Sequence, residues 1–320
     1  MKRIGLIVNH GSHAVATRGA MLESVALELP DASYLLLDDF ADLHGHIRQM
    51  AKNGVEKVFI EGGDGTLLAV LSACLDPEAG FKTLPEFAIL PGGSTNLAAR
   101  SFGFRGKTVG EVTRRIAAIA HEVEPPIRET HRALKIENAA LPSPAIGFVL
   151  STGTLARAML YAQREFHGEG QRGSRTILRA IRQFLKAPYK YYDTDGVPLL
   201  RASDLSVKGA GVALEGPHAL ALLSSLPRLS LGLNPFWGEG PGAIALTHAA
   251  WPIKGFRRAM ARVLLHLPGR GLTAHGMTSY RGDRFELIHT DPIVIDGEAM
   301  PHAGDGRLIV SVTGPLVFLR

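Results

Sequence analysis

The segment EGGDGT at residues 61–66 constrains this chain more than any other feature. It follows a short apolar run, Lys57–Glu61, that is typical of a buried strand, and it precedes Thr66–Leu75, whose apolar residues recur at helical spacing. Three glycines at such a junction let the backbone approach a ligand closely, and the first amides of the following helix favour an anion. The segment therefore predicts a phosphate-binding turn at the carboxyl end of a strand.

Asp64 is the acidic residue inside this turn. A carboxylate beside phosphates suits the organisation of Mg²⁺ or the activation of a hydroxyl group. The segment is neither a Walker A motif nor the dinucleotide fingerprint, because it lacks Gly-Lys-Ser/Thr and its glycine spacing differs. The alternative interpretation is a Gly-rich turn in which Asp64 or Thr66 caps the helix.

The first 125 residues alternate strand and helix patterns, which predicts an α/β domain with an open, mostly parallel sheet. The expected strands are Arg3–Asn9, Ser33–Leu37, Lys57–Glu61 and Phe87–Leu90. The expected helices are Thr17–Leu29, Phe40–Asn53, Thr66–Leu75, one from about Thr95, and Thr108–His121.

Beyond a Pro-containing linker at Glu122–Glu129, short strand-like runs punctuated by Gly and Pro predict a β-rich, antiparallel sandwich-like domain. The expected strands are Ala133–Ile136, Ala145–Leu150, Leu205–Leu214, Ala219–Ser224, Ala243–Thr247, Phe285–His289, Ile293–Ile295, Arg307–Val312 and Leu316–Leu319. Helical inserts are expected at Leu155–Phe166 with Ser174–Ala187, and at Lys254–Leu265. The chain thus divides into residues 1–125, residues 126–305 and a final strand within 306–320.

Two further segments carry candidate site residues. LPGGSTN at residues 90–96 follows the next strand, so its polar groups can face the same crevice as Asp64; the alternative is a capped helix start. Asp296-Gly297-Glu298 follows an apolar run near the C-terminus, and without its context Asp-Gly indicates a hairpin turn.

Composition narrows the classes of partner. The net charge of +5 and the pI near 9.4 favour anionic partners, but no Lys/Arg run is long enough for a nucleic-acid arm. Cys74 is the single cysteine, which excludes intramolecular disulfides and Cys-based zinc sites. No apolar stretch of about 18 residues occurs, so we expect no membrane span and a cytoplasmic protein. A homodimer is one of the assemblies that the sequence permits.

Together these segments resemble the diacylglycerol kinase catalytic family, which includes bacterial lipid kinases and sphingosine kinases. GGDGT matches fully, and LPGGSTN is similar to the family's Gly-Thr-x-Asn-Asp segment. Asn9 lies where the family has Asn-Pro, and the DGE triplet lies where the family places it. GGDGT alone is shared with NAD kinases, whereas DGE favours the lipid kinases.

The resemblance implies an ATP-dependent lipid kinase that transfers the γ-phosphoryl group to a hydroxyl of a diacylglycerol-like lipid. Asp64 would also hold Mg²⁺, and Glu298, with Asp296 beside it, would be the base. The final strand would return to the first domain, and the second would bind the lipid. The nucleotide site would comprise Asn9, Gly62, Gly63, Asp64, Gly65, Thr66, Gly93, Ser94 and Asn96.

Three departures leave alternatives open. His10 replaces the family's Pro, Leu97 replaces its second acid, and Glu239-Gly240 stands where members often have Asp-Gly. An NAD kinase-like enzyme and a non-catalytic nucleotide- or lipid-binding relative are therefore the rivals. Ser174–Ala187 and Lys254–Leu265 are basic amphipathic helices, and we expect at least one to contact an anionic membrane surface; the alternative is a solvated face.

Overall fold

A computed structural model describes residues 3–93, 96–167, 190–193, 196–229, 232–265, 267, 269–301 and 303–320. The chain divides into two compact units. The first comprises Met1–Arg132 and Gly314–Arg320, and the second comprises Ala133–Thr313. The helix expected at Ser174–Ala187 and the residue Ser94 lie outside the described residues.

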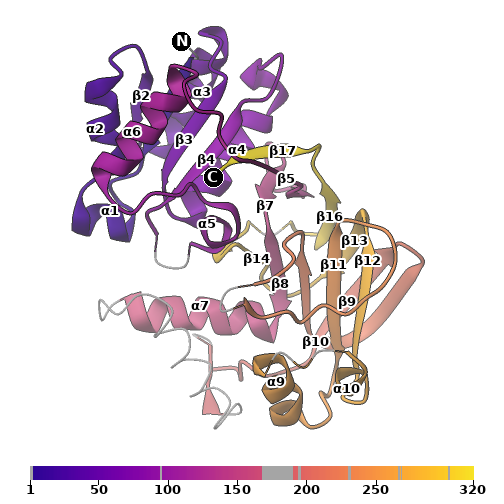
Figure 1. The fold of residues 1–320 in the computed structure, drawn as a ribbon. Helices are drawn as coiled ribbons and strands as arrows, with labels where there is room; N and C mark the ends of the chain where they lie inside the picture. The colour runs from indigo at the N-terminus through magenta and orange to yellow at the C-terminus, as the bar shows by residue number, and fades with distance from the viewer. Residues whose placement is uncertain are drawn as a thin grey trace. The chain divides into compact units, whose positions relative to one another are not determined.

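The first unit is built on a mostly parallel sheet (Figure 1). In spatial order its strands are β2 (Ser33–Leu36), β1 (Ile4–Val8), β3 (Lys57–Gly62), β4 (Glu86–Pro91), β17 (Leu316–Leu319) and β5 (Arg128–His131). Only β5 runs antiparallel to its neighbour, β17, and it begins inside the segment expected to be a linker. The predicted α/β fold is confirmed.

Helices α2 and α6 lie side by side over one face of this sheet (Figure 1). Their apolar residues pack with Leu6, Phe59 and Ala88 of the sheet. The neighbouring residues Ile7 and Val58 are also buried but do not belong to this cluster, as expected because successive side chains of a strand point to opposite faces. The helical segments of the unit are α1 (His13–Arg18), α2 (Met21–Glu28), η1 (Phe40–Asp42), α3 (Leu43–Lys52), α4 (Asp64–Leu75), η2 (Pro77–Ala79), α5 (Leu97–Phe102) and α6 (Val109–Ala120).

The single helix expected over Thr17–Leu29 is wrong, because α1 and α2 are separate helices. Gly19 ends α1 with a φ of 82°, a left-handed value that glycine adopts without a steric penalty. The amide of Gly19 still bonds to the carbonyl of Val15, at 2.8 Å. This break places Arg18 and the start of α2 beside β3.

The second unit is antiparallel and β-rich, as predicted. Its main strand order is β15-β14-β8-β10-β9-β13-β16-β6-β7, and β11 pairs with both β10 and β12. The strands are β6 (Leu134–Glu137), β7 (Ala145–Gly147), β8 (Val149–Gly153), β9 (Ser203–Gly209), β10 (Val212–Ser224), β11 (Ile244–Ala250), β12 (Met277–Gly282), β13 (Arg284–His289), β14 (Val294–Ile295), β15 (Glu298–Ala299) and β16 (Arg307–Val312).

The single strand expected over Leu205–Leu214 is instead the end of β9, a two-residue turn and the start of β10, which pair as a hairpin. Ala210 and Gly211 both have positive φ, as a two-residue type I′ turn requires. The sequence prediction also missed β12. Helices α7 (Thr154–His167), α9 (Phe256–Leu264) and α10 (Arg270–Thr273) complete the described part of this unit, and no helix in the described residues is long and apolar enough to cross a membrane.

Candidate functional site

The candidate site of the first unit lies where the strand order reverses. Strand β2 flanks β1 on one side and β3 flanks it on the other, so the carboxyl ends of β1 and β3 border a topological switch point. In open α/β sheets ligands bind at such a point. Asn9 follows β1, residues 63–66 follow β3, and residues 92–96 follow β4. The fold thus brings the predicted loops together.

The glycines are required by the contact between the loops that follow β3 and β4. A Cβ atom on Gly93 would lie 2.6 Å from the Cα of Gly63, and one on Gly92 would lie 2.8 Å from the Cα of Gly62. The amide of Gly92 donates to the carbonyl of Gly62 at 2.8 Å. Because real Cβ atoms do not approach so closely, the two loops can pack only as glycine backbone.

Side chains from the loop after β1 hold the glycine turn. The Asn9 Nδ2 donates to the Thr66 Oγ1 at 2.8 Å, which ties the end of β1 to the first turn of α4. The Ser12 Oγ accepts from the amide of Gly63 at 3.1 Å. Ser12 is nearly fully buried and was missed by the sequence prediction, since nothing local links it to a residue 51 positions away.

Asp64 is the first residue of α4, and Gly63 is its N-cap. No side chain caps the helix at that position, so the alternative in which Asp64 or Thr66 serves as the N-cap is wrong. The first amides of any α-helix lack intrahelical acceptors, and they carry the positive end of the helix dipole. Half-buried Asp64 therefore lies where an anion is favoured.

Asn96 closes its own loop. Its Oδ1 accepts from the amide of Gly93 at 2.8 Å, and its Nδ2 donates to the carbonyl of Gly93 at 2.7 Å. Its φ of 49° is left-handed, a conformation that asparagine tolerates better than most residues. These contacts fix Gly93 against the other glycine loop, so Asn96 shapes the site through the backbone.

Glu61 has a structural role within the same motif. Its side chain is fully buried and accepts hydrogen bonds from Arg18 Nη2 at 2.8 Å and from the amides of Met21 and Leu22 at 3.1 and 2.9 Å. Those two amides belong to the first turn of α2, which has no side-chain N-cap. Glu61 therefore satisfies the start of α2 and fixes it to β3.

In the second unit, Asp296 and Gly297 form the turn between β14 and β15. Both have positive φ, 48° and 99°, which suits a type I′ hairpin. The Asp296 carboxylate accepts from the amides of Phe148, at 2.9 Å, and Val149, at 2.8 Å. Asp296 thus anchors the hairpin to β8.

Glu298, by contrast, is solvent-exposed on β15 and pairs through its backbone with Ile295. Gln163 of α7 donates to the carbonyl of Gly297, which fixes the turn from the other side. The predicted triplet therefore divides into an anchoring carboxylate and an exposed carboxylate, and Glu298 is the one available for chemistry.

At the glycine loops, Asp64 is the carboxylate that a magnesium ion would bind. Mg²⁺ usually takes one or two protein carboxylates and completes its shell with water and substrate phosphates, so Asp64 fits such a site. Leu97 is buried at the start of α5 and offers no ligand. In the described part of the chain, no group of three or more His, Cys, Asp or Glu side chains could hold a metal ion.

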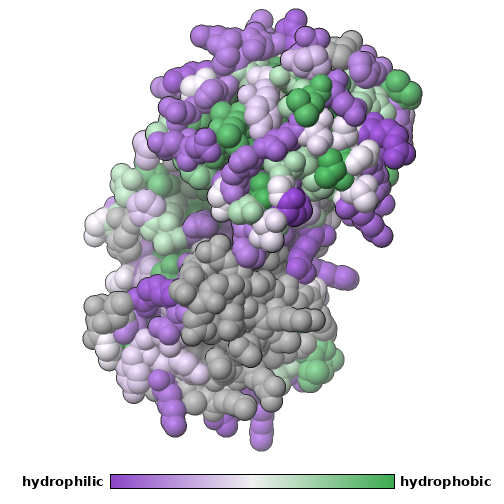
Figure 2. Space-filling view, turned by 90° about the vertical axis from the view of Figure 1, so that its left-hand side faces the viewer, coloured by the Kyte–Doolittle hydropathy of each residue, from purple (hydrophilic) through white to green (hydrophobic). Residues whose placement is uncertain are grey.

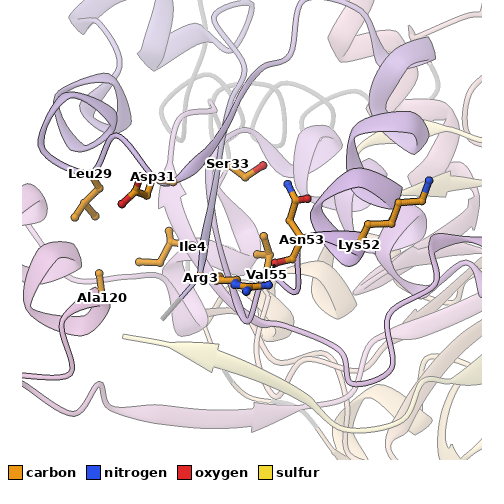
Figure 3. Close-up of a pocket in the computed structure, with 10 residues that line it drawn as sticks. Arg3, Ile4, Leu29, Asp31, Ser33, Lys52, Asn53, Val55 and Ala120 are labelled. Atoms are coloured by element: carbon orange, nitrogen blue, oxygen red, sulfur yellow. Dashed lines mark hydrogen bonds between the residues drawn. The ribbon is translucent and has the colours of Figure 1, made fainter. Parts of the chain in front are cut away.

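A separate cavity of about 690 Å³ opens at the opposite, amino-terminal edge of the first sheet (Figure 3). Arg3 and Ile4 from the start of β1, Ser33 from the start of β2, and Lys52 and Asn53 from the end of α3 line it. It contains none of the predicted site residues, so the cavity and the glycine loops lie at different ends of the same strands.

Comparison with known proteins agrees with the motifs. Residues 4–125 match the sequence model of the diacylglycerol kinase catalytic domain. This region contains both glycine loops, so the resemblance inferred from the sequence is confirmed for the first unit. No curated protein matches the chain.

Solved structures are similar over nearly the whole chain. A diacylglycerol kinase from Bacillus anthracis str. Sterne aligns with a TM-score of 0.62 and 13% identity, covering 99% of this chain and 96% of that one. A proposed diacylglycerol kinase from the same organism aligns with a TM-score of 0.66 and 14% identity, covering 99% and 95%. At this identity the likeness shows a shared fold.

Proposed function

We propose that this chain is an ATP-dependent lipid kinase that phosphorylates a hydroxyl of a diacylglycerol-like lipid. The observation that carries the proposal is the loop arrangement at the switch point, where glycine backbone from two strand ends meets the first turn of α4. The match of residues 4–125 to the diacylglycerol kinase catalytic domain supports a kinase rather than another nucleotide-binding class.

The nucleotide phosphates would lie against the backbone of Gly63, Gly65 and Gly93. The amide of Gly65 and the other first amides of α4 would favour the triphosphate without reorganising, because Ser12, Asn9 and Asn96 already hold the loops, with the amides of Gly63 and Gly93 donating to Ser12 and Asn96. Asp64, with the phosphates, would hold Mg²⁺, which supplies charge neutralisation in phosphoryl transfer.

The exposed Glu298 carboxylate would accept the proton of the lipid hydroxyl. The hydroxyl oxygen would then form a bond to the γ-phosphorus as the bond from that phosphorus to the ADP oxygen breaks, and ADP leaves. Asp296 would position Glu298 by fixing the hairpin, since its carboxylate is engaged with two backbone amides. A neutral hydroxyl acceptor is the kind of substrate that needs such a base.

The test is transfer of the γ-phosphoryl group from radiolabelled ATP to a lipid panel dispersed in detergent micelles with Mg²⁺. Asp64→Asn and Glu298→Gln should each lower the rate, by on the order of 100-fold or more for the base. Asp31→Asn, at the opposite edge of the first sheet, and Glu215→Gln, exposed on β10, are the matched controls and should keep activity.

Retained activity in Glu298→Gln would refute the assignment of the base. Transfer to NAD but not to any lipid would refute the lipid acceptor and support the soluble-substrate rival. Tight ATP binding with no transfer to either acceptor would support a non-catalytic relative, the reading that Leu97 favours, because that position lacks the second acid and is buried.

A further inference from the structure

The cavity at the amino-terminal edge of the first sheet has no part in the proposed reaction, and one side of it is apolar. Ile4, Leu29, Val55 and Ala120 line it, and each has 5% or less of its surface exposed. In Figure 3, Leu29, Ile4 and Ala120 lie together on one side of the cavity, and they belong to one apolar cluster. On the view in Figure 2, hydrophobic residues are scattered among hydrophilic ones, so apolar side chains gathered in one hollow are a distinct feature.

The other side of the cavity carries hydrogen-bond donors. Arg3, Asn53 and Lys52 lie there (Figure 3), and Ser33 adds a hydroxyl group. The guanidinium group of Arg3 donates to the carbonyl of Asn53, which fixes it at the end of α3 and leaves further N–H groups for a ligand. The Oδ1 of Asn53 accepts from Gln49 at 2.9 Å, so its Nδ2 is the atom left to donate.

The charges at the cavity favour an anion. Among the lining residues that the structure describes, Arg3 and Lys52 are cations and Asp31 is the one carboxylate. A helix end such as that of α3 favours a cation through its free carbonyls. Here three amides that follow α3 donate back to carbonyls of its last turn, at 2.9 to 3.0 Å, so the helix end does not need Lys52.

We propose that this cavity binds a small amphiphile with one anionic head group, a carboxylate or a phosphate, on a short apolar chain. The chain would lie on the apolar side, and the head group would accept hydrogen bonds from Arg3 and Lys52, since the guanidinium fork matches both kinds of anion. A volume of about 690 Å³ is within the range of pockets that enclose small ligands. The inference does not rest on the proposed kinase activity.

The test is titration calorimetry of the full chain with octyl phosphate and with octanoate, both below the concentrations at which they form micelles. At least one should bind, and the tighter of the two identifies the head group. Octanol lacks the charge and inorganic phosphate lacks the chain, so each should bind at least about tenfold more weakly. Binding of neither anion would overturn the proposal.

Variants locate the site. Arg3→Gln should weaken binding by about tenfold or more, because it removes a charge-assisted hydrogen bond. Arg3→Lys should recover part of that loss, because the charge remains without the planar fork. Lys52→Gln, at an exposed position, should also weaken binding. The matched control is Arg48→Gln, which removes an exposed cation of α3 outside the cavity lining and should bind like the parent.

The same titration separates this cavity from the proposed kinase site. An amphiphile that entered the kinase site instead would lose binding in Glu298→Gln and keep it in Arg3→Gln, and that outcome would overturn the proposal. Equal binding of octanol and the two anions, or unchanged binding in both Arg3→Gln and Lys52→Gln, would also overturn it. Failure of phosphotransfer to any lipid would leave these binding results unaffected, because no nucleotide is present in the titration.

Discussion

Mild acid is expected to destabilise the second unit through His248. This residue lies on β11 with 9% of its surface exposed, and its ring is 6.1 Å from that of His218. Burial, and then the charge of nearby His218, lowers the pKa of His248 from 6.5 to about 4. The pKa of His218 is lowered as well, chiefly by burial, although Asp291 opposes that effect.

The sign follows from proton counting. Since the folded pKa of His248 lies below its unfolded value, the unfolded chain binds more protons between these two values. The contribution of neutral His248 to the free energy of unfolding is complete above about pH 6.5 and is lost as the pH falls toward about 4. The expected loss in the free energy of unfolding from His248 alone is about 2 kcal/mol at about pH 5 and about 3 kcal/mol at full protonation.

The assay is urea unfolding followed by tryptophan fluorescence at about pH 7.5 and about pH 5. Trp237 and Trp251 are the only tryptophans, and both pack against the cluster of Ala249 and Met277, so the signal reports on the second unit. His248→Gln removes the titrating group, and its loss of stability between the two pH values should be smaller than the parent's by about 2 kcal/mol.

His44→Gln removes an exposed histidine of the first unit and controls for the loss of a histidine as such. If His248→Gln and the parent lose the same stability on acidification, the reasoning from burial is wrong.

Two further predictions concern packing. Gly93→Ala should weaken ATP binding measured by calorimetry and lower the free energy of unfolding by about 1–3 kcal/mol, because the new Cβ would meet Gly63. The control Gly45→Ala, whose Cβ would have nothing within 4 Å, should change neither. Unchanged ATP binding by Gly93→Ala would show that the two loops can separate. Arg157→Ala should lower the free energy of unfolding in urea by about 3–5 kcal/mol, because it leaves the buried Asp291 carboxylate without its cation. The double variant with Asp291→Ala should recover part of that loss. An equal loss in the single and the double variant would contradict an ion-pair origin.

The candidate site was predictable where its signals are local. A buried strand that runs into glycines and then into a helix is a continuous pattern, so the positions of Asp64 and Gly93 at strand ends followed from the sequence. Asp296-Gly297 was likewise recognisable as a turn, because two residues of positive φ restrict which amino acids fit. The division into an α/β and a β-rich part came from the change in hydrophobic period.

Residue roles that depend on distant partners were not predictable. Glu61 belongs to the motif, yet only the folded sheet shows that it holds the start of α2, and Ser12 joined the site through a contact with Gly63. The sequence predicted that the glycines let a phosphate approach the backbone, whereas the structure shows that they let the two loops pack against each other. Strand β5 was taken for a linker because its partner, β17, lies far along the chain.

The sequence by itself determined the order of strands and helices and the residue types at the ends of the strands. These depend on periodicity and turn chemistry within a few residues. The tertiary structure alone decided which strand ends meet, which carboxylate of the DGE triplet is held by backbone amides and which is exposed. That decision follows from strand order and from the need to satisfy every buried polar group, neither of which is encoded in any single segment.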